Sequence, residues 1–189
     1  RNPAVIETVT NGDTGAIAVT LLIWAGDQKA GTRVIADWTL IDSPEAANEF
    51  VEKILSTPRF ILRDGTSLSN VIETSSRLFR GNGYEGNRKV VDISGDGTNN
   101  IGYEPTVARD VAVRAGITIN GLAILTDFPD LDLYYGEQIV GGPGAFVVSA
   151  QNFHAFSAAV LNKLVREIAG TPGPKLDRAQ SFAQVPPVE

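Results

Sequence analysis

Apolar and polar positions follow two different periods along this chain, and each period predicts one kind of element. Short runs that are apolar throughout, or at alternate positions, are typical of strands, whereas apolar residues spaced three and four apart are typical of helices. Residues 15–24 are almost uninterrupted apolar, which predicts a strand covered on both faces. Residues 32–41 carry Arg33 and Asp37, which predicts a strand near a sheet edge, joined to the first by a hairpin. Further strand patterns occur at residues 88–94, 117–125 and 146–150.

Helical spacing fills most of the chain between these strands. The helix with the clearest start has Ser43 as its cap and Pro44 in its first position, and its predicted apolar face is Phe50, Ile54 and Leu55. Another helix is predicted to begin at Thr66 or Ser67. The helical segments are residues 42–57, 66–80, 105–116 and 151–170, with a short helix and a glycine loop between residues 131 and 145.

The alternation of strands and helices predicts the fold class and the domain organisation. Strands that alternate with helices of 10 to 17 residues indicate right-handed crossovers, and therefore an α/β domain with a doubly wound, mostly parallel sheet and helices on both faces. We expect this domain to occupy residues 1–170. Residues 171–189 hold four prolines without periodicity, which predicts an extended tail, either solvated or docked on a partner or on its own domain.

Composition narrows the classes of function. A chain of 189 residues with 43% hydrophobic content is large enough for one domain with its own core. Sixteen basic and 22 acidic residues give a net charge of −6 without a basic stripe, which argues against a nucleic-acid partner. The absence of cysteine excludes disulfides and thiolate metal sites. No apolar run reaches the roughly 18 residues that a membrane span requires.

Acidic and hydroxyl side chains stand where two segments end at the predicted sheet edge. Asp96 follows the strand at residues 88–94, and Thr66 opens a helix directly after Gly65. Ligands bind outside the carboxyl ends of strands in such sheets, and carboxylate, hydroxyl and water oxygens suit Mg²⁺ or a similar divalent cation. Thr66 and Asp96 therefore form a candidate partial metal site. The alternative is that Thr66 caps its helix and that Asp96 bonds the amides of its own turn.

Asp92 poses a separate question, because it lies inside an apolar strand. A carboxylate in that position needs a hydroxyl, a backbone amide or an arginine as its partner. We expect Asp92 to have a structural role beneath the rim rather than a catalytic one.

Several stretches together resemble a known family. They are "GAIAVTLLIWAG", "WTLIDSPEAANEF", "GTSLSNVIE", "KVVDISGDGTNNIG", "ARDVAVRAGITINGLAIL" and "YYGEQIVGGPGAFVVSAQNFHAFSAAVLNKLVREIA". The chain from residue 1 to about 169 resembles bacterial von Willebrand factor A-like proteins, specifically an uncharacterised proteobacterial group with a domain of unknown function. The resemblance implies an exported protein, periplasmic or extracellular, that is not an enzyme.

The resemblance also implies a cation site of the metal-ion-dependent adhesion type. In that family, Asp-x-Ser-x-Ser comes from the first strand, a threonine from a later loop, and an aspartate follows the fourth strand. Thr66 matches the threonine and Asp96 the late aspartate, with Gly65, Ser67, Asp92 and Ser94 in supporting positions. Residues 92–96 superficially offer Asp-x-Ser-x-Asp, but they follow the threonine, so chain order argues against that match.

The first motif of the family is missing from this sequence, and so is the first strand. The resemblance places that strand in the middle of the sheet, between residues 15–24 and 88–94, so that its absence would leave two apolar edges unpaired. We expect either an upstream strand that this sequence does not include or a strand supplied by another polypeptide.

Two functions fit these observations. The first is a protein-binding module whose rim cation is completed by an acidic group of a partner protein. The second is an accessory or structural subunit of a larger assembly, in solution or at a membrane, without a functional metal site. An enzyme based on Asp92 and Asp96 has little support, because no base, nucleophile pair or phosphate loop accompanies them. His154 is predicted to lie at the surface beside Phe153, which begins the apolar face of the last helix.

Overall fold

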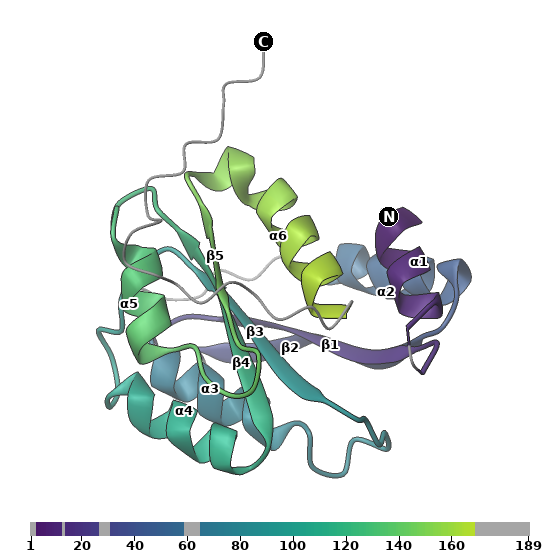
Figure 1. The fold of residues 1–189 in the computed structure, drawn as a ribbon, viewed down its shortest axis with the longest axis horizontal. Coiled ribbons are helices and arrows are strands. Elements are labelled where there is room, and N and C mark those ends of the chain that lie inside the picture. The colour runs from purple at the N-terminus through teal and green to yellow at the C-terminus, as the bar shows by residue number, and fades with distance from the viewer. Residues whose placement is uncertain (1–2, 13, 27–30, 59–64, 169–189) are drawn as a thin grey trace.

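The computed structural model describes residues 3–12, 14–26, 31–58 and 65–168 (Figure 1). The predicted tail at residues 171–189 lies outside the described residues. In chain order the elements are α1 (Pro3–Thr10), β1 (Ile17–Trp24), β2 (Thr32–Ile41), α2 (Pro44–Ser56), α3 (Leu68–Arg77), β3 (Lys89–Gly95), α4 (Pro105–Arg114), β4 (Ile117–Ile124), α5 (Leu131–Gln138), β5 (Val147–Ala150) and α6 (Phe153–Ile168). No helix in this described part combines the length and apolar character needed to cross a bilayer.

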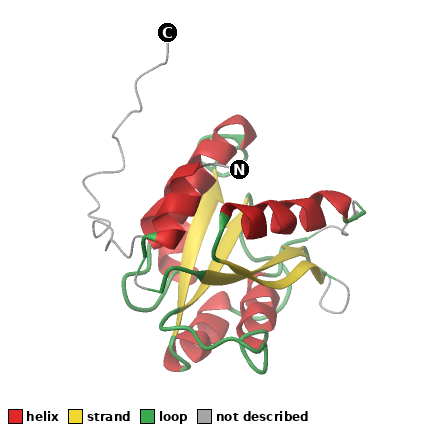
Figure 2. Cartoon of the chain, turned by 90° about the vertical axis from the view of Figure 1, so that its right-hand side faces the viewer, coloured by secondary structure: helices red, strands yellow, loops and turns green. Residues whose placement is uncertain are grey.

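The strands form two sheets that are not hydrogen-bonded to each other. β1 and β2 pair antiparallel as a hairpin, whereas β3, β4 and β5 form a parallel sheet in that order. Figure 2 shows the hairpin running across the direction of the three-stranded sheet. Among the described strands, β1 pairs only with β2, and β3 pairs only with β4. The other edge of each of these strands pairs with no described strand.

Helices cover both faces of the three-stranded sheet, because β4 is apolar on both sides. Ile119 and Ala123 belong to the larger core cluster, which lies against α3, α4 and α5. Leu122 and Ile124 point the other way, into a smaller cluster with Ala159 of α6. The strand alternates side chains between two faces, so consecutive apolar residues supply both cores.

Helix α3 ties the two sheets together. It contacts both β2 and β3, and its residues Leu68, Val71 and Ile72 are buried. The carboxyl ends of β1 and β3 also meet, because a Cβ on Gly95 would lie 3.1 Å from the ring of Trp24. Both sheets consequently present their strand ends at one rim.

The predicted helices and strands are present, whereas several side chains that were predicted to be buried are exposed. The hairpin, the α/β class and the Ser43 cap are present, and the Ser43 hydroxyl accepts a hydrogen bond from the Ala46 amide at 3.2 Å. The predicted mostly parallel sheet is present as a parallel three-stranded sheet and a separate antiparallel hairpin, and the edges of β1 and β3 that pair with no described strand are the two that we expected to be unpaired. β1, predicted to be covered on both faces, has no fully buried residue. Leu55 and Phe153, predicted on apolar faces, are 70% and 59% exposed, because no described element packs over them.

Candidate functional site

The loop after β3 is fastened to the start of α3 by two asparagines. The Asn99 Oδ1 accepts hydrogen bonds from the amides of Leu68, at 2.8 Å, and Ser69, at 3.4 Å. The Asn100 Oδ1 accepts from the Thr66 amide at 2.7 Å. In return, the Asn100 amide donates to the Thr66 carbonyl at 2.9 Å. These bonds join segments about 30 residues apart and set the shape of the rim.

The hydrogen bonds of Asn99 and Asn100 place the Thr66 hydroxyl beside the turn that carries Asp96. A Cβ built on Gly97 would lie 3.3 Å from the Thr66 Oγ1, so the hydroxyl lies directly against the residue that follows Asp96. Thr66 is half-buried and Asp96 is exposed. The structure therefore brings the two predicted segments together at the rim, with one carboxylate open to solvent.

Two serine hydroxyls lie just inside the rim without hydrogen-bond partners. Ser67 and Ser69 are buried, and neither Oγ has a partner among the described residues. Ser67 stands at the cap position of α3 but makes no side-chain cap bond, because the Asn99 carboxamide has taken that role. Helix capping is thus performed by Asn99, and neither the Ser67 nor the Thr66 side chain was needed for it.

Below Asp96 lies a buried tyrosine. A Cβ on Gly95 would approach the Tyr135 hydroxyl to 2.5 Å, so glycine is needed for this close approach. Burial raises the pKa of Tyr135, and the charge of Asp96 raises it further. The hydroxyl is therefore neutral, and it has no hydrogen-bond partner among the described residues.

The remaining predicted residues occupy different places. Gly65 has φ +106°, and a Cβ on Gly26 would lie 2.6 Å from its Cα, so two backbone segments cross closely here. Ser94 is half-buried on β3. Asp92 is not part of the rim: it forms an ion pair with Lys163 of α6. We predicted a hydroxyl, a backbone amide or an arginine as the partner of Asp92. The partner is a lysine instead, and Lys163 is too distant in sequence for the local pattern to reveal it.

The rim offers few ligands for a metal ion by itself. The described residues contain no group of three or more histidine, aspartate or glutamate side chains that could hold one. What they offer is the Asp96 carboxylate, the Thr66 hydroxyl and the unpartnered serine hydroxyls behind it. These oxygens suit a hard cation such as Mg²⁺, but its coordination would need water and further donors.

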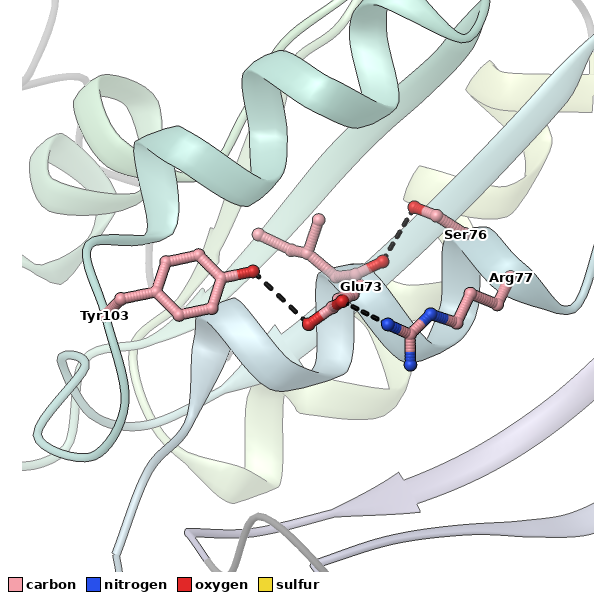
Figure 3. Close-up of polar contacts among 5 residues, drawn as sticks. Glu73, Ser76, Arg77 and Tyr103 are labelled. Atoms are coloured by element: carbon pink, nitrogen blue, oxygen red, sulfur yellow. Dashed lines mark hydrogen bonds and ion pairs between the residues drawn. The ribbon is translucent and has the colours of Figure 1, made fainter.

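A second polar group holds the far end of the same loop against α3 (Figure 3). The Tyr103 hydroxyl donates to the Glu73 carboxylate at 3.3 Å, and Arg77 forms an ion pair with the same carboxylate one turn along the helix. Partial burial, followed by the charge of Glu73, raises the pKa of Tyr103. We did not predict the contact with Tyr103, although Glu73 and Arg77 have the i, i+4 spacing of a helical ion pair.

The sequence of this chain was compared with protein families and with curated proteins. The family described as "Protein of unknown function (DUF1194)" matches residues 1–172. No curated protein matches the chain.

Solved structures share the fold at low sequence identity. Proximal thread matrix protein 1 from the mussel byssus is 18% identical with a TM-score of 0.60, over 88% of this chain and 41% of its own. This chain thus spans about two fifths of that protein's length. Another structure of the same protein has a zinc-occupied MIDAS motif, with 16% identity and a TM-score of 0.53 over 89% of this chain and 43% of that one. BatB from Bacteroides thetaiotaomicron is 17% identical with a TM-score of 0.51, over 89% of this chain and 86% of its own.

Proposed function

Because the chain belongs to the family of unknown function DUF1194 and has a von Willebrand factor A-like fold, we propose that it is a non-enzymatic protein-binding module. Its contact surface is the rim around Thr66 and Asp96. The observation that carries this proposal is the pair of asparagines that holds the Thr66 hydroxyl against the Asp96 turn. Such fixed strand-end loops are where ligands bind in α/β domains.

A divalent cation at this rim is the second part of the proposal. Asp96 would supply a carboxylate oxygen and Thr66 a hydroxyl, and Gly65, Ser67 and Ser94 would support them. Mg²⁺ retains several waters when few protein ligands reach it, so an acidic group of a partner can replace one of them. One neighbour in fold has a zinc-occupied MIDAS motif, which supports a cation for this class of domain.

Calorimetric titration tests the cation. MgCl₂ is titrated into the polypeptide purified from the cells that make it, and into its Asp96→Asn and Thr66→Ala variants. We expect binding to the unmodified protein and at least a tenfold loss of affinity in Asp96→Asn. Glu137→Gln, an exposed carboxylate on α5, is the matched control and should bind as the unmodified protein does. Equal binding by all four proteins, or no binding by any, would remove the cation from the proposal.

We further propose that one more strand joins the two sheets in a doubly wound arrangement, parallel to β1 and β3. β1 has no charged residue, whereas the outer strand β2 carries Arg33 and Asp37, and edge strands exposed to water normally carry charges. A strand between β1 and β3 would pair with the free edge of each of these two strands. It would also bring the hairpin into line with the sheet, because neighbouring strands differ by only about 20–25°.

Hydrogen exchange with mass spectrometry tests this strand on the polypeptide from its own cells. We expect amides of Ile17–Trp24 to exchange as slowly as those of Ile117–Ile124. An intact mass above that of residues 1–189 would place the strand in the same polypeptide, and a co-purifying chain would place it in another. Fast exchange of β1 in a monomer would contradict both sources.

The open edges also favour a second function, that of an accessory or structural subunit of a larger assembly. In that case a partner supplies the strand, no cation is required, and the tail at residues 171–189 offers an additional docking segment. A structural neighbour is described as an aerotolerance-related membrane protein, and it shares the fold at 18% identity. Size-exclusion chromatography separates the two functions, because a subunit of this kind elutes with its partner after Asp96→Asn as well as before.

The proposed location is the periplasm or the extracellular space. The proposal rests on the family resemblance of the sequence. Fractionation of the producing cells, followed by immunodetection of the chain, tests it.

A further inference from the structure

A polar cluster in which Lys163 and Asn120 are buried lies between α6 and the three-stranded sheet, on the face opposite the larger core. Lys163 of α6 is only 3% exposed, and its ammonium group forms an ion pair with Asp92 of β3. Glu167, one turn further along α6, accepts a hydrogen bond from the Asn120 Nδ2 of β4 at 3.1 Å. Three elements that are distant in sequence thus meet through two carboxyl groups, one ammonium group and one carboxamide.

Asn120 fixes the position of the Glu167 carboxyl group. Its Oδ1 accepts the buried Phe146 amide at 3.1 Å, which turns its Nδ2 toward the Glu167 carboxyl. Asn120 is 1% exposed, so neither contact can be exchanged for water. The Glu167 carboxyl is therefore held at a fixed position beside Asp92 and Lys163.

The cluster contains two carboxyl groups and one buried cation. If both carboxyls were ionised, one negative charge would remain uncompensated under α6, and burial strongly disfavours such a charge. Burial, and then the Asp92 carboxylate, raises the pKa of Glu167 to about 8, although Lys163 and Asn120 act in the opposite direction. Near neutral pH, the pair consequently keeps one proton.

We propose that Asp92, Lys163 and Glu167 form a clasp that shares one proton between its two carboxyl groups, and that α6 loosens from the sheet as this proton is given up. Two arginines lie near the cluster, and among the described contacts neither forms an ion pair with Asp92 or Glu167. Arg88, which donates to the Glu167 carbonyl at 3.1 Å, is exposed. Arg166 stacks on the Phe146 ring, 3.9 Å from its centre.

Within the described part of the chain, the other elements that pack on α6 add no counter-charge. α1 carries only Glu7, which is exposed, and β5 has no titratable residue. Asp92, by contrast, retains 30% side-chain exposure on the free edge of β3. Protons can therefore enter and leave the cluster from that edge.

Carboxyl ¹³C NMR tests the clasp directly in the whole chain. The Glu167 resonance is assigned by its loss in Glu167→Gln and followed from pH 4 to pH 10. We expect its midpoint near pH 8. A midpoint in the ordinary glutamate range of about 4 to 5 overturns the proposal.

Hydrogen exchange tests the consequence for the helix. Opening of α6 releases the proton, so protection of Phe153–Ile168, corrected for intrinsic exchange, should fall by up to about tenfold per pH unit from pH 6 to 8. Above pH 8 the protection should level off. Glu167→Gln should remove this slope, whereas Glu49→Gln, an exposed residue of α2, should retain it. The same slope in Glu167→Gln as in the unmodified protein contradicts the clasp.

Asp92→Asn distinguishes proton sharing from a purely structural contact. It removes the neighbouring negative charge and leaves Lys163 to pair with Glu167, so the Glu167 midpoint should fall by about one pH unit or more. A structural contact alone predicts an unchanged midpoint. If Glu167→Gln fails to fold, the Glu167 resonance is assigned through its own backbone amide by triple-resonance NMR, and the Asp92→Asn comparison then decides the question.

Discussion

Asn99 and Asn100 show how single side chains can decide the geometry of a site. In the sequence they are two turn-forming residues after an apolar strand, and nothing in the local sequence distinguishes them from loop residues without tertiary contacts. In the structure they cap α3 and hold Thr66 across about 30 residues. The candidate ligands Thr66 and Asp96 could be named from the sequence because their chemistry is local, whereas the residues that position them could not.

Replacing Asn99 by alanine should destabilise the protein by about 1–2 kcal/mol, because the Leu68 and Ser69 amides lose their acceptor at the helix start. The measurement is the free energy of unfolding in urea. Asn99→Asp keeps an acceptor at the same position and should retain most of the stability. An equal loss in both variants would show that the Asn99 donor to the Tyr103 carbonyl is the important contact instead.

Helices α2 and α3 show what periodicity can and cannot reveal about an element. Both have a clear apolar face, and both occupy close to their predicted ranges. α3 lies between two sheets and buries its face, whereas no residue of α2 is fully buried, and Leu55 is 70% exposed. Spacing identifies the face of a helix, but only a neighbouring element determines whether that face is covered.

Two alanine variants measure this difference. Ile72→Ala, in α3, should cost about 2–5 kcal/mol, because it leaves a cavity in the larger core. Leu55→Ala, in α2, should change the free energy of unfolding by no more than about 0.5 kcal/mol. A large loss in Leu55→Ala would indicate that another element or a partner covers α2 in solution.

The molecule as a whole combines two sheets with a buried charge cluster, and neither follows from any one segment. The divided sheet arises because no described strand lies between β1 and β3, although each is individually a good strand. The cluster arises because α6 lies across β3 and β4, which brings Lys163 and Glu167 onto Asp92. Both features depend on packing between distant parts of the chain.

The pH dependence of stability should report this cluster. Glu167 keeps its proton up to about pH 8 in the folded protein but only to about 4.5 when unfolded, so folding retains a proton between these values. The free energy of unfolding should therefore fall from pH 5 to pH 8, by roughly 1.4 kcal/mol per pH unit at most, and become level above pH 8. Urea denaturation across this range should show a smaller slope in Glu167→Gln. Identical slopes in the two proteins would mean that other groups set the dependence.

The sequence by itself determined the element types, most of their bounds, the family resemblance and the chemistry of Thr66 and Asp96, because periodicity, caps and side-chain type are local properties. Only the tertiary structure decided that the hairpin runs across the three-stranded sheet, that Asn99 rather than a rim hydroxyl caps α3, and that Asp92 pairs with Lys163. The physical reason is that sheet pairing, burial and buried ion pairs are interactions between segments distant in sequence. Their energies depend on which surfaces meet, and no local pattern contains that information.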